Sequence, residues 1–594
     1  MARDDAGVAA DYRARLADRR ATLDGFERRH ALVSRIRLAL AGAAGIVVLV
    51  RGRAGLPWAG VLAVAFLAAV VVHARVLAAR ARARRAVGWY EQGIRRLTHT
   101  WMGHGDPGER FRPGAHVYAD DLDVFGRGGL FELLSTPRTL AGQTTLAAWL
   151  LEAAPPAVVS ARQDAVRELA GRADLREAIA VLGEDVHVEA TSLRSWAASP
   201  PAFAWRVWPI LLALLSSATI AALGVYLAGA RLSPLLLGLF GLQMAVARAL
   251  QARVREVLHR VASPARDLVV LAGLLRVLER TAFEAPALRR LVSAVTAGSQ
   301  PASREIAGLD RLVGCLAWRQ NLIFALPAAL MLWATQVALA VDRWRRRVRV
   351  SVPGWLDAVG ELEALAALAT LAAEHPGWAF PALGAGAARL EAAGLAHPLL
   401  PADAVPNDVA LGGQAPAVLI VSGSNMSGKS TLLRAIGVNV VLAQAGGPVR
   451  ARSCRLSPLV PGTSIRVVDS LQDGTSRFFA EISRLKVIVD LGRRHPDGLL
   501  FLLDEILGGT NSHDRAHGAA ALVAGLVRTG AIGLVTTHDL ALSRLADDAS
   551  VRAVNVHFAD RFDEGGLQFD YRMRPGPVRT SNALALMRSV GLDV

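Results

Sequence analysis

The stretch "GSNMSGKSTLLRAIGVN" follows the apolar run "APAVLIV" and precedes an apolar pattern with helical spacing. Gly423, Gly428, Lys429 and Ser430 satisfy G-x-x-x-x-G-K-[ST], in which backbone N–H groups between a strand and a helix cradle phosphate oxygens. Lys429 is one of two lysines, with Lys486, in a chain of 67 lysines plus arginines. A compact ammonium on a flexible stem suits this loop, whereas a rigid guanidinium fork does not. The stretch therefore predicts an α/β nucleotide-binding domain; the alternative is a glycine-rich turn without a ligand.

The predicted loop supplies most of the expected ligands of ATP. These are Gly423, Ser424, Asn425, Met426, Ser427, Gly428, Lys429, Ser430 and Thr431. Lys429 is expected to reach the β- and γ-phosphates, and the Ser430 hydroxyl is expected on Mg²⁺. ATP and Mg²⁺ are therefore the cofactors that this stretch predicts.

Two further apolar runs end in polar residues. "GLLFLLDEI" ends at Asp504 and Glu505, and "AIGLVTTHDL" runs into His538. Because ligands of an open α/β sheet bind at the carboxyl ends of its strands, we expect these side chains to gather beside Lys429. Asp504 is expected to bind Mg²⁺ through water, Glu505 to orient or deprotonate the attacking water, and His538 to contact the γ-phosphate. A lone histidine at a strand end is usually structural, but the two other elements at the same edge favour a catalytic role.

Composition limits the remaining possibilities. A chain of 594 residues is long enough for several domains, and its net charge of +16 indicates an anionic partner, either nucleic acid or anionic lipid. Its only two cysteines, Cys315 and Cys454, lie far apart, which argues against a disulfide framework. The hydrophobic content of 53% is high for a purely soluble protein, and it is concentrated in a few segments.

Four apolar segments are expected to cross a membrane as two helical hairpins. They cover residues 36–50, 54–73, 208–230 and 232–247, and the first and last are short for a bilayer. Arginines gather outside the hairpins rather than in their turns, which predicts a multi-pass protein of the cell membrane with a cytoplasmic N-terminus and ATPase domain. The alternative is buried core helices of a soluble protein. A fifth apolar run, Leu322 to Val341, is interpreted as a buried helix, because a fifth crossing would contradict the charge pattern.

These features predict a multidomain α and α/β fold with two transmembrane helical hairpins. The expected domains are a charged helix and first hairpin (1–106), a helical core (107–202), the second hairpin (203–249), a further helical core or lever (250–395) and a P-loop ATPase domain (396–594). The domains between the hairpins and the ATPase are expected to be entirely helical, from their apolar spacing.

Four stretches together resemble the ATPase domain of the MutS mismatch-repair family, an ABC-type ATPase. They are "SGSNMSGKSTLLRAIGVNVVLAQAGGPVRA", "DGTSRFFAEISRL", "LLDEILGGTNSHD" and "TTHD". "AHPLLPADAVPNDVAL" is similar to the family's lead-in, and "RPGPVRTSNALALMRSVGL" resembles its closing segment. The resemblance covers the last 200 residues or so; residues 121–170 are more weakly similar to the start of the family's helical core. The arrangement also resembles a membrane-anchored subfamily.

The resemblance implies roles for four further residues. Asn407 in the lead-in is implied to contact ATP, and Ser476 is implied to reach the γ-phosphate of a partner chain. Asn511 and Asp514 are implied to link the two sites of a dimer. The resemblance thus implies a homodimer, and an ordinary helix cap is the alternative role for Ser476.

Two function classes follow from these observations. The first is a membrane-anchored MutS-like ATPase that hydrolyses ATP as a dimer and clamps DNA, with anionic membrane lipids as further partners. The second is an ATP-driven membrane machine whose ATPase dimer moves the hairpins without nucleic acid. The apolar segments carry no carboxylates, which disfavours ion transport. Family members that read mismatches begin with a domain carrying an aromatic wedge, whereas this chain begins with a charged helix, so mismatch reading is doubtful. No protein partner is identifiable.

Overall fold

The computed structural model describes residues 2–182, 194, 196, 199–200, 202–203, 207–229, 234–262, 265–298, 300–317, 327–424, 426–466, 477–508, 511–538, 540–563 and 566–578. The chain divides into two compact units, each discontinuous in sequence. Unit 1 comprises Met1–Thr136, Leu146–Val181 and Leu365–Val594; unit 2 comprises Pro137–Thr145 and Leu182–Ala364. The five expected domains are contiguous stretches, and their bounds stay a prediction.

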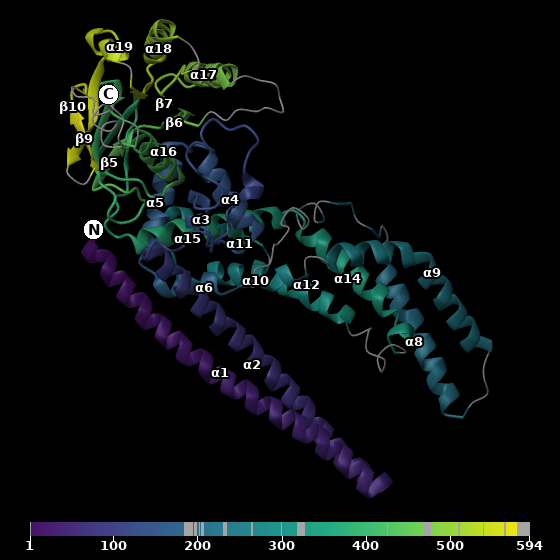
Figure 1. Ribbon diagram of the computed structural model, residues 1–594. Helices are drawn as coiled ribbons and strands as arrows, with labels where there is room; N and C mark the ends of the chain where they lie inside the picture. Colours follow the sequence, from purple (N-terminus) through teal and green to yellow (C-terminus); the bar gives the residue numbers. More distant parts are fainter. Residues whose placement is uncertain are drawn as a thin grey trace. The chain divides into compact units, whose positions relative to one another are not determined.

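A six-stranded sheet in unit 1 carries the predicted loop (Figure 1). Its strands are β4 (Val418–Ser422), β6 (Val460–Ser464), β7 (Leu499–Asp504), β8 (Ile532–Thr537), β9 (Ala553–Asp563) and β10 (Gly566–Pro575), in the spatial order β10-β9-β4-β8-β7-β6. The pairs from β9 to β6 are parallel, and β10 is an antiparallel edge strand. β4 and β8 are buried throughout, as strands covered on both faces must be.

Helices cover both faces of this sheet. Alternate residues of β7 point to opposite faces, so Leu499, Phe501 and Leu503 share a buried cluster with α17 (Arg477–Arg494) and α18 (Ser512–Val527). α16 (Lys429–Ala445) packs on the other face, where Gly437 lies over Leu502. A Cβ at Gly437 would lie 2.5 Å from a methyl carbon of Leu122 and 3.0 Å from one of Leu502, so a larger residue would require these leucine side chains to shift. The short α19 (Leu540–Ser543) and η4 (Arg544–Asp547) connect β8 to β9.

A smaller mixed sheet combines three strands that precede the loop with one, β5, that follows α16. It contains β1 (Ala382–Leu383), β5 (Ser453–Leu456), β2 (Arg389–Leu395) and β3 (Asn407–Gly412), in that spatial order. The prediction that residues up to 395 belong to a helical core is therefore wrong from residue 382 onward. The strand β2 reads "RLEAAGL", which is short and rich in alanine and glycine, and its alternating burial emerges only when it pairs with β3 and β5.

The N-terminal helices of unit 1 form a long pair (Figure 1, purple). α1 (Ala2–Arg51) and α2 (Leu56–Leu97) are joined by η1 (Gly52–Gly55) and lie antiparallel, with Arg20 near Glu91 and Glu27 near Arg80. At the base of the pair, Arg96 of α2 donates two hydrogen bonds of 2.6 and 2.7 Å to the fully buried Glu374. The remaining elements of this unit are η2 (Glu109–Phe111), α3 (Leu130–Leu133), α5 (Pro156–Ala170), α6 (Ala173–Ala180) and the ends of α4 (Leu140–Leu151) and α15 (Ser351–Glu374).

The described part of unit 2 is helical. Its helices are α8 (Trp208–Leu227), α9 (Pro234–Ala262), α10 (Ala265–Arg280), α11 (Pro286–Thr296), α12 (Ala302–Ala317) and α14 (Trp333–Val348), with the starts of α4 and α15. The predicted helix over 322–341 differs from the structure. Residues 322–326 lie outside the described residues, and Leu332 adopts φ 49°, so that a new helix begins at Trp333. The described apolar residues of α14 include the buried Val337 and Val341.

Three helical segments of the described residues are long and apolar enough to cross a membrane by length and composition. They are Ala6–Leu97, which takes in α1, η1 and α2, then Trp208–Leu227 and Pro234–Leu258. The most apolar windows of these segments are only 6%, 17% and 17% buried. Leu38 and Leu49 of α1, for example, are 77% and 85% exposed.

Candidate functional site

The glycine-rich loop turns sharply between β4 and α16. Gly423 adopts φ 152° and Gly428 adopts φ 105°, both in the region that favours glycine. A Cβ at Gly423 would lie 2.8 Å from the Ser427 hydroxyl oxygen and 3.1 Å from the Phe558 carbonyl oxygen. Met426 also has a positive φ of 72°, and its side chain is 83% exposed. The sequence therefore places its glycines where the loop geometry requires them.

Lys429 begins α16 and is 4% exposed. Its ammonium donates hydrogen bonds to the carbonyl oxygens of Gly423, at 2.7 Å, and Ser424, at 3.1 Å, and lies 3.3 Å from the Glu505 carboxylate. Among the described residues, the hydroxyl oxygens of Ser424 and Ser427 are buried and have no hydrogen-bond partner. A buried cation and two unpaired hydroxyls around a helix N-terminus fit an anionic group such as a phosphate.

The strand order gathers the predicted catalytic residues at one edge of the sheet. β8 lies between β4 and β7, so the segments after these three strands are neighbours. The carboxylate of Glu505, which directly follows β7, lies between Lys429 and His538, 3.5 Å from His538 Nδ1. Asp504 ends β7 and accepts a hydrogen bond from the hydroxyl of Thr536. The structure thus brings together Lys429, Glu505 and His538, and adds Thr536, which lies in the "TTHD" stretch but to which the sequence analysis assigned no role.

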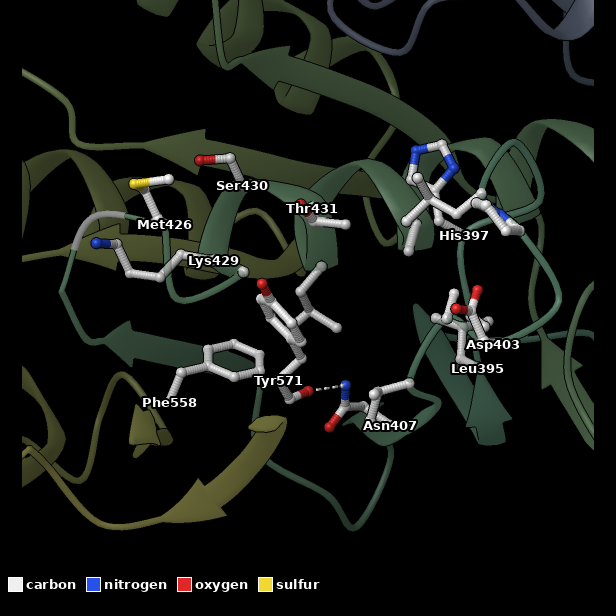
Figure 2. A pocket seen from close by; sticks show the side chains of 18 of the residues that line it. Leu395, His397, Asp403, Asn407, Met426, Lys429, Ser430, Thr431, Phe558 and Tyr571 are labelled. Atoms are coloured by element: carbon white, nitrogen blue, oxygen red, sulfur yellow. Dashed lines mark hydrogen bonds between the residues drawn. The ribbon is translucent and has the colours of Figure 1, made fainter. Parts of the chain in front are cut away.

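A cavity of about 520 Å³ adjoins the loop (Figure 2). In Figure 2, Lys429 and Met426 lie at one end, His397 and Asp403 lie at the other, and the Tyr571 ring lies between the two ends. The lining combines loop residues with apolar and aromatic side chains: Ser424, Gly428, Ser430, Thr431 and Glu505 from the first group, and Leu395, Leu400, Val405, Phe558 and Tyr571 from the second. The cavity therefore has a polar end at Lys429 and Glu505 and a mainly apolar end that also holds His397 and Asp403.

The apolar end is held in place by a buried arginine. Arg450, 4% exposed, donates hydrogen bonds to the carbonyl oxygens of His397 (2.9 Å), Leu400 (2.6 Å) and Pro401 (2.7 Å). Burial, together with the nearby charges of Arg434 and Arg450, lowers the pKa of His397 to about 4. His397 is therefore a neutral imidazole at pH 7, so the ionisable side chain beside it at this end of the cavity is Asp403.

Asn407 lines the cavity, but both ends of its side-chain amide bond to β10. It donates to the Tyr571 carbonyl oxygen at 3.0 Å and accepts from the Met573 N–H at 2.7 Å. Asn407 thus fixes the backbone that carries Tyr571, rather than offering its own amide to a ligand. Tyr571 and Phe558 are site residues that sequence reasoning missed, because they lie well over a hundred residues beyond the loop and carry no motif.

Of four further predicted residues, two lie outside the described residues and two hydrogen-bond to each other at the start of α18. Ser476 and Asn425 lie outside the described residues. Asn511 caps α18: its side chain accepts from the Asp514 N–H at 2.9 Å and donates to the Asp514 carboxylate at 2.7 Å. The pair forms a reciprocal helix cap, and its expected role in linking two sites stays a prediction.

The site belongs to a domain with known relatives. The family model for MutS domain V matches residues 419–593. The chain is 32% identical over 278 residues to the DNA mismatch repair protein MutS of Thermus thermophilus, covering 46% of this chain and 33% of that protein. It is 35% identical over 242 residues to Endonuclease MutS2 from another strain of Thermus thermophilus, covering 41% and 31%. It is 33% identical over 241 residues to the DNA mismatch repair protein MSH3 of Phaeosphaeria nodorum, covering 39% and 21%.

The chain spans about a third, or less, of the length of these curated relatives. The match includes the loop at Lys429, the strand end at Glu505 and His538, which are the residues that converge beside the cavity. The geometry of the site and the similarity of the surrounding sequence thus agree. The C-terminal part of the chain, residues 419–593, thus matches MutS domain V and is similar in sequence to MutS and MutS2 proteins.

Proposed function

We propose that this protein is a membrane-anchored MutS-like ATPase that binds and hydrolyses ATP as a dimer and clamps DNA. The observation that carries the proposal is the convergence of Lys429, Glu505 and His538 at the polar end of a 520 Å³ cavity with an apolar far end. Such a cavity matches a nucleoside triphosphate in both its charged and its aromatic parts.

The polar end fits the phosphates. Lys429 is buried and cationic, and the N–H groups at the start of α16 add positive potential. The buried hydroxyls of Ser424 and Ser427 supply further donors. At the other end, Tyr571 and Phe558 offer aromatic surface to a base. The neutral His397 and the Asp403 carboxylate at this end suit an uncharged heterocycle with hydrogen-bond donors better than an anionic group.

Glu505 is the proposed general base. Its carboxylate is now paired with Lys429 and lies near His538. When a phosphate binds the Lys429 ammonium, the Glu505 carboxylate loses its ion-pair partner. It can then accept a proton from a water molecule. His538 is 58% exposed in its side chain and is placed to donate a hydrogen bond to the terminal phosphate. In this proposal Glu505 accepts a proton, His538 donates a hydrogen bond and Lys429 compensates phosphate charge, all at the same edge of the sheet.

Mg²⁺ would be held by Ser430 and Asp504. Ser430 lines the cavity in the first turn of α16, and Thr536 fixes the carboxylate of Asp504 at the end of β7. Hydroxyl and carboxylate oxygens are the ligands that this hard cation prefers, so the donor set fits. The ion would neutralise negative charge on the phosphates.

The membrane anchor is proposed from the helices. α1, α2, α8 and α9 include the segments that are long and apolar enough to span, and their apolar windows are largely exposed. α1 and α2 pair in antiparallel orientation, with ion pairs between the start of α1 and the end of α2. The turn at Arg51–Gly55 therefore lies at the opposite end of the pair from these charged residues. We propose that these helices cross the cell membrane as hairpins, with the N-terminus and the ATPase domain in the cytoplasm and anionic lipids at the arginine-rich ends.

The DNA and dimer parts of the proposal rest on sequence similarity and charge. Relatives are described as DNA mismatch repair proteins, and a net charge of +16 suits a polyanion. Exposed apolar side chains on α17, including Phe479 at 61% and Ile482 at 42%, suit a surface that a second chain covers. Mismatch reading is not part of the proposal.

The test uses the full-length protein in detergent. Wild-type chain should hydrolyse ATP with Mg²⁺; Lys429→Ala should lose nucleotide binding, and Glu505→Gln should bind ATP without turnover. Arg167→Ala, which removes an exposed cation that pairs with Asp164 on α5, is the control and should hydrolyse normally. A Glu505→Gln variant with the wild-type rate contradicts the assignment.

DNA binding is tested on the same preparation by titrating salt. Clamping through phosphates predicts an affinity that falls steeply as salt rises, because counterions are released on binding. A chain that hydrolyses ATP but has no salt-dependent affinity for DNA instead supports an ATP-driven membrane machine that moves the hairpins.

A further inference from the structure

Thr536 is a buried residue of β8 whose hydroxyl contacts the Asp504 carboxylate and the backbone N–H of Glu505. We propose that Thr536 is a positioning residue: its hydroxyl orients Asp504 for the metal ion and Glu505 for the attacking water at the same time. The inference rests on the proposed ATPase function and adds to it a role for a residue that the motifs left without one.

The contacts use the single donor of the hydroxyl and one of its two acceptor lone pairs. Thr536 Oγ1 donates its only hydrogen to Asp504 Oδ1, and it accepts the N–H of Glu505 at 3.0 Å. Thr536 is 1% exposed, so water does not replace either bond. A hydrogen bond to a carboxylate is stronger than one between neutral groups, so the Asp504 carboxylate has one favoured orientation.

The strand register creates this arrangement. Asp504 of β7 pairs with Thr536 of the parallel strand β8, which places both side chains on the same face of the sheet. Thr537, the next residue, therefore points to the opposite face. A shift by one residue would exchange the two threonines, so the register decides which of them serves the carboxylates.

The backbone of Glu505 depends on the same hydroxyl. Glu505 adopts φ 46°, a left-handed conformation that costs a non-glycine residue free energy and persists only where its surroundings hold it. The hydrogen bond from its N–H to Thr536 is such a restraint. Without that bond the residue can relax toward negative φ, and its carboxylate then leaves the position between Lys429 and His538.

The test compares Thr536→Val, which keeps the shape but removes the hydroxyl, with Thr536→Ser, which keeps the hydroxyl. Two readouts are taken: kcat for ATP, and the Mg²⁺ concentration that half-saturates the binding of a fluorescent ATP analogue. We expect Thr536→Val to lower kcat roughly 10- to 100-fold and to raise the half-saturating Mg²⁺ several-fold, because both carboxylates lose orientation. Binding of the analogue without Mg²⁺ should stay within about twofold of wild type, and Thr536→Ser should restore both values.

Thr463→Val is the matched control. Thr463 is also a buried threonine of the same sheet, and its hydroxyl lies 2.6 Å from a carboxylate oxygen of Asp121, away from Glu505. If Thr536→Val only weakens folding, both valine variants should lower the melting temperature and kcat alike and leave the Mg²⁺ half-saturation unchanged; that result overturns the proposal.

An unchanged Mg²⁺ half-saturation and kcat in Thr536→Val also overturn it. If the wild-type chain hydrolyses ATP no faster than Lys429→Ala, the proposed ATPase function is refuted instead. The Mg²⁺ dependence of analogue binding still reads the orientation of Asp504 in that case, and a wild-type-like Thr536→Val would then refute the inference by itself.

Discussion

Replacing Glu363 with glutamine should change how the stability of the protein depends on pH. Glu363 of α15 is 1% exposed and caps the start of α4, accepting the Arg138 N–H at 2.8 Å, the Thr139 N–H at 3.3 Å and the Thr139 hydroxyl. Burial raises the pKa of this carboxyl to about 7, although the three hydrogen bonds act in the opposite direction. Glutamine keeps a carbonyl oxygen for the same N–H groups but does not titrate.

The sign and size follow from the two pKa values. The carboxyl has an ordinary value of 4.5 and a folded value of about 7, so folding takes up a proton between these pH values. The contribution of Glu363 to stability is fully present below pH 4.5 and is lost as the pH rises through about 7. At about 1.36 kcal/mol for each tenfold difference in acidity, the loss is roughly 3 kcal/mol.

The assay is the melting temperature of full-length wild type and Glu363→Gln from pH 5 to pH 8.5. As the pH rises, wild type should lose stability relative to the variant by about 5–10 °C, the shift that roughly 3 kcal/mol produces in a unit of this size. Glu361→Gln is the control on the same helix, because Glu361 pairs with Arg290 near the surface. The difference in melting temperature between wild type and Glu361→Gln should not change with pH in this way. If the difference in melting temperature between wild type and Glu363→Gln stays constant across this pH range, the reasoning is refuted.

Three further predictions concern the helix base, the topology and the dimer. Removing either partner of the buried Arg96–Glu374 pair alone should cost about 3–5 kcal/mol, whereas the double replacement with methionine should cost less, in a double-mutant cycle of melting temperatures. An impermeant thiol reagent applied to intact cells should label Ser233→Cys and not Lys486→Cys; Cys454 is unsuitable as a reporter, because burial raises the pKa of its thiol to about 12. Mixing Lys429→Ala chains with Ser476→Arg chains should restore ATPase activity, since one composite site is then intact; inactive mixtures that co-purify would contradict a shared site.

The sequence by itself determined the parts of the site that depend on local pattern. The spacing of Gly423, Gly428 and Lys429 predicts the loop because a strand, a tight turn and a helix leave few other choices. Asp504, Glu505 and His538 could be placed together because parallel strands present their carboxyl ends at one edge. The loop and these strand ends lie where the sequence indicates.

Only the tertiary structure decided which partners those residues have. The order β4-β8-β7 and the pairing of Asp504 with Thr536 arise from sheet register, which a single sequence does not encode locally. The strand β2 and the break at Leu332 went against their apolar patterns, because pairing and packing with distant segments outweigh propensity in short, alanine-rich stretches. Asn407 bonds to β10 from 164 residues away, and Glu363 meets Thr139 across 224 residues; such contacts exist only when the chain folds back on itself.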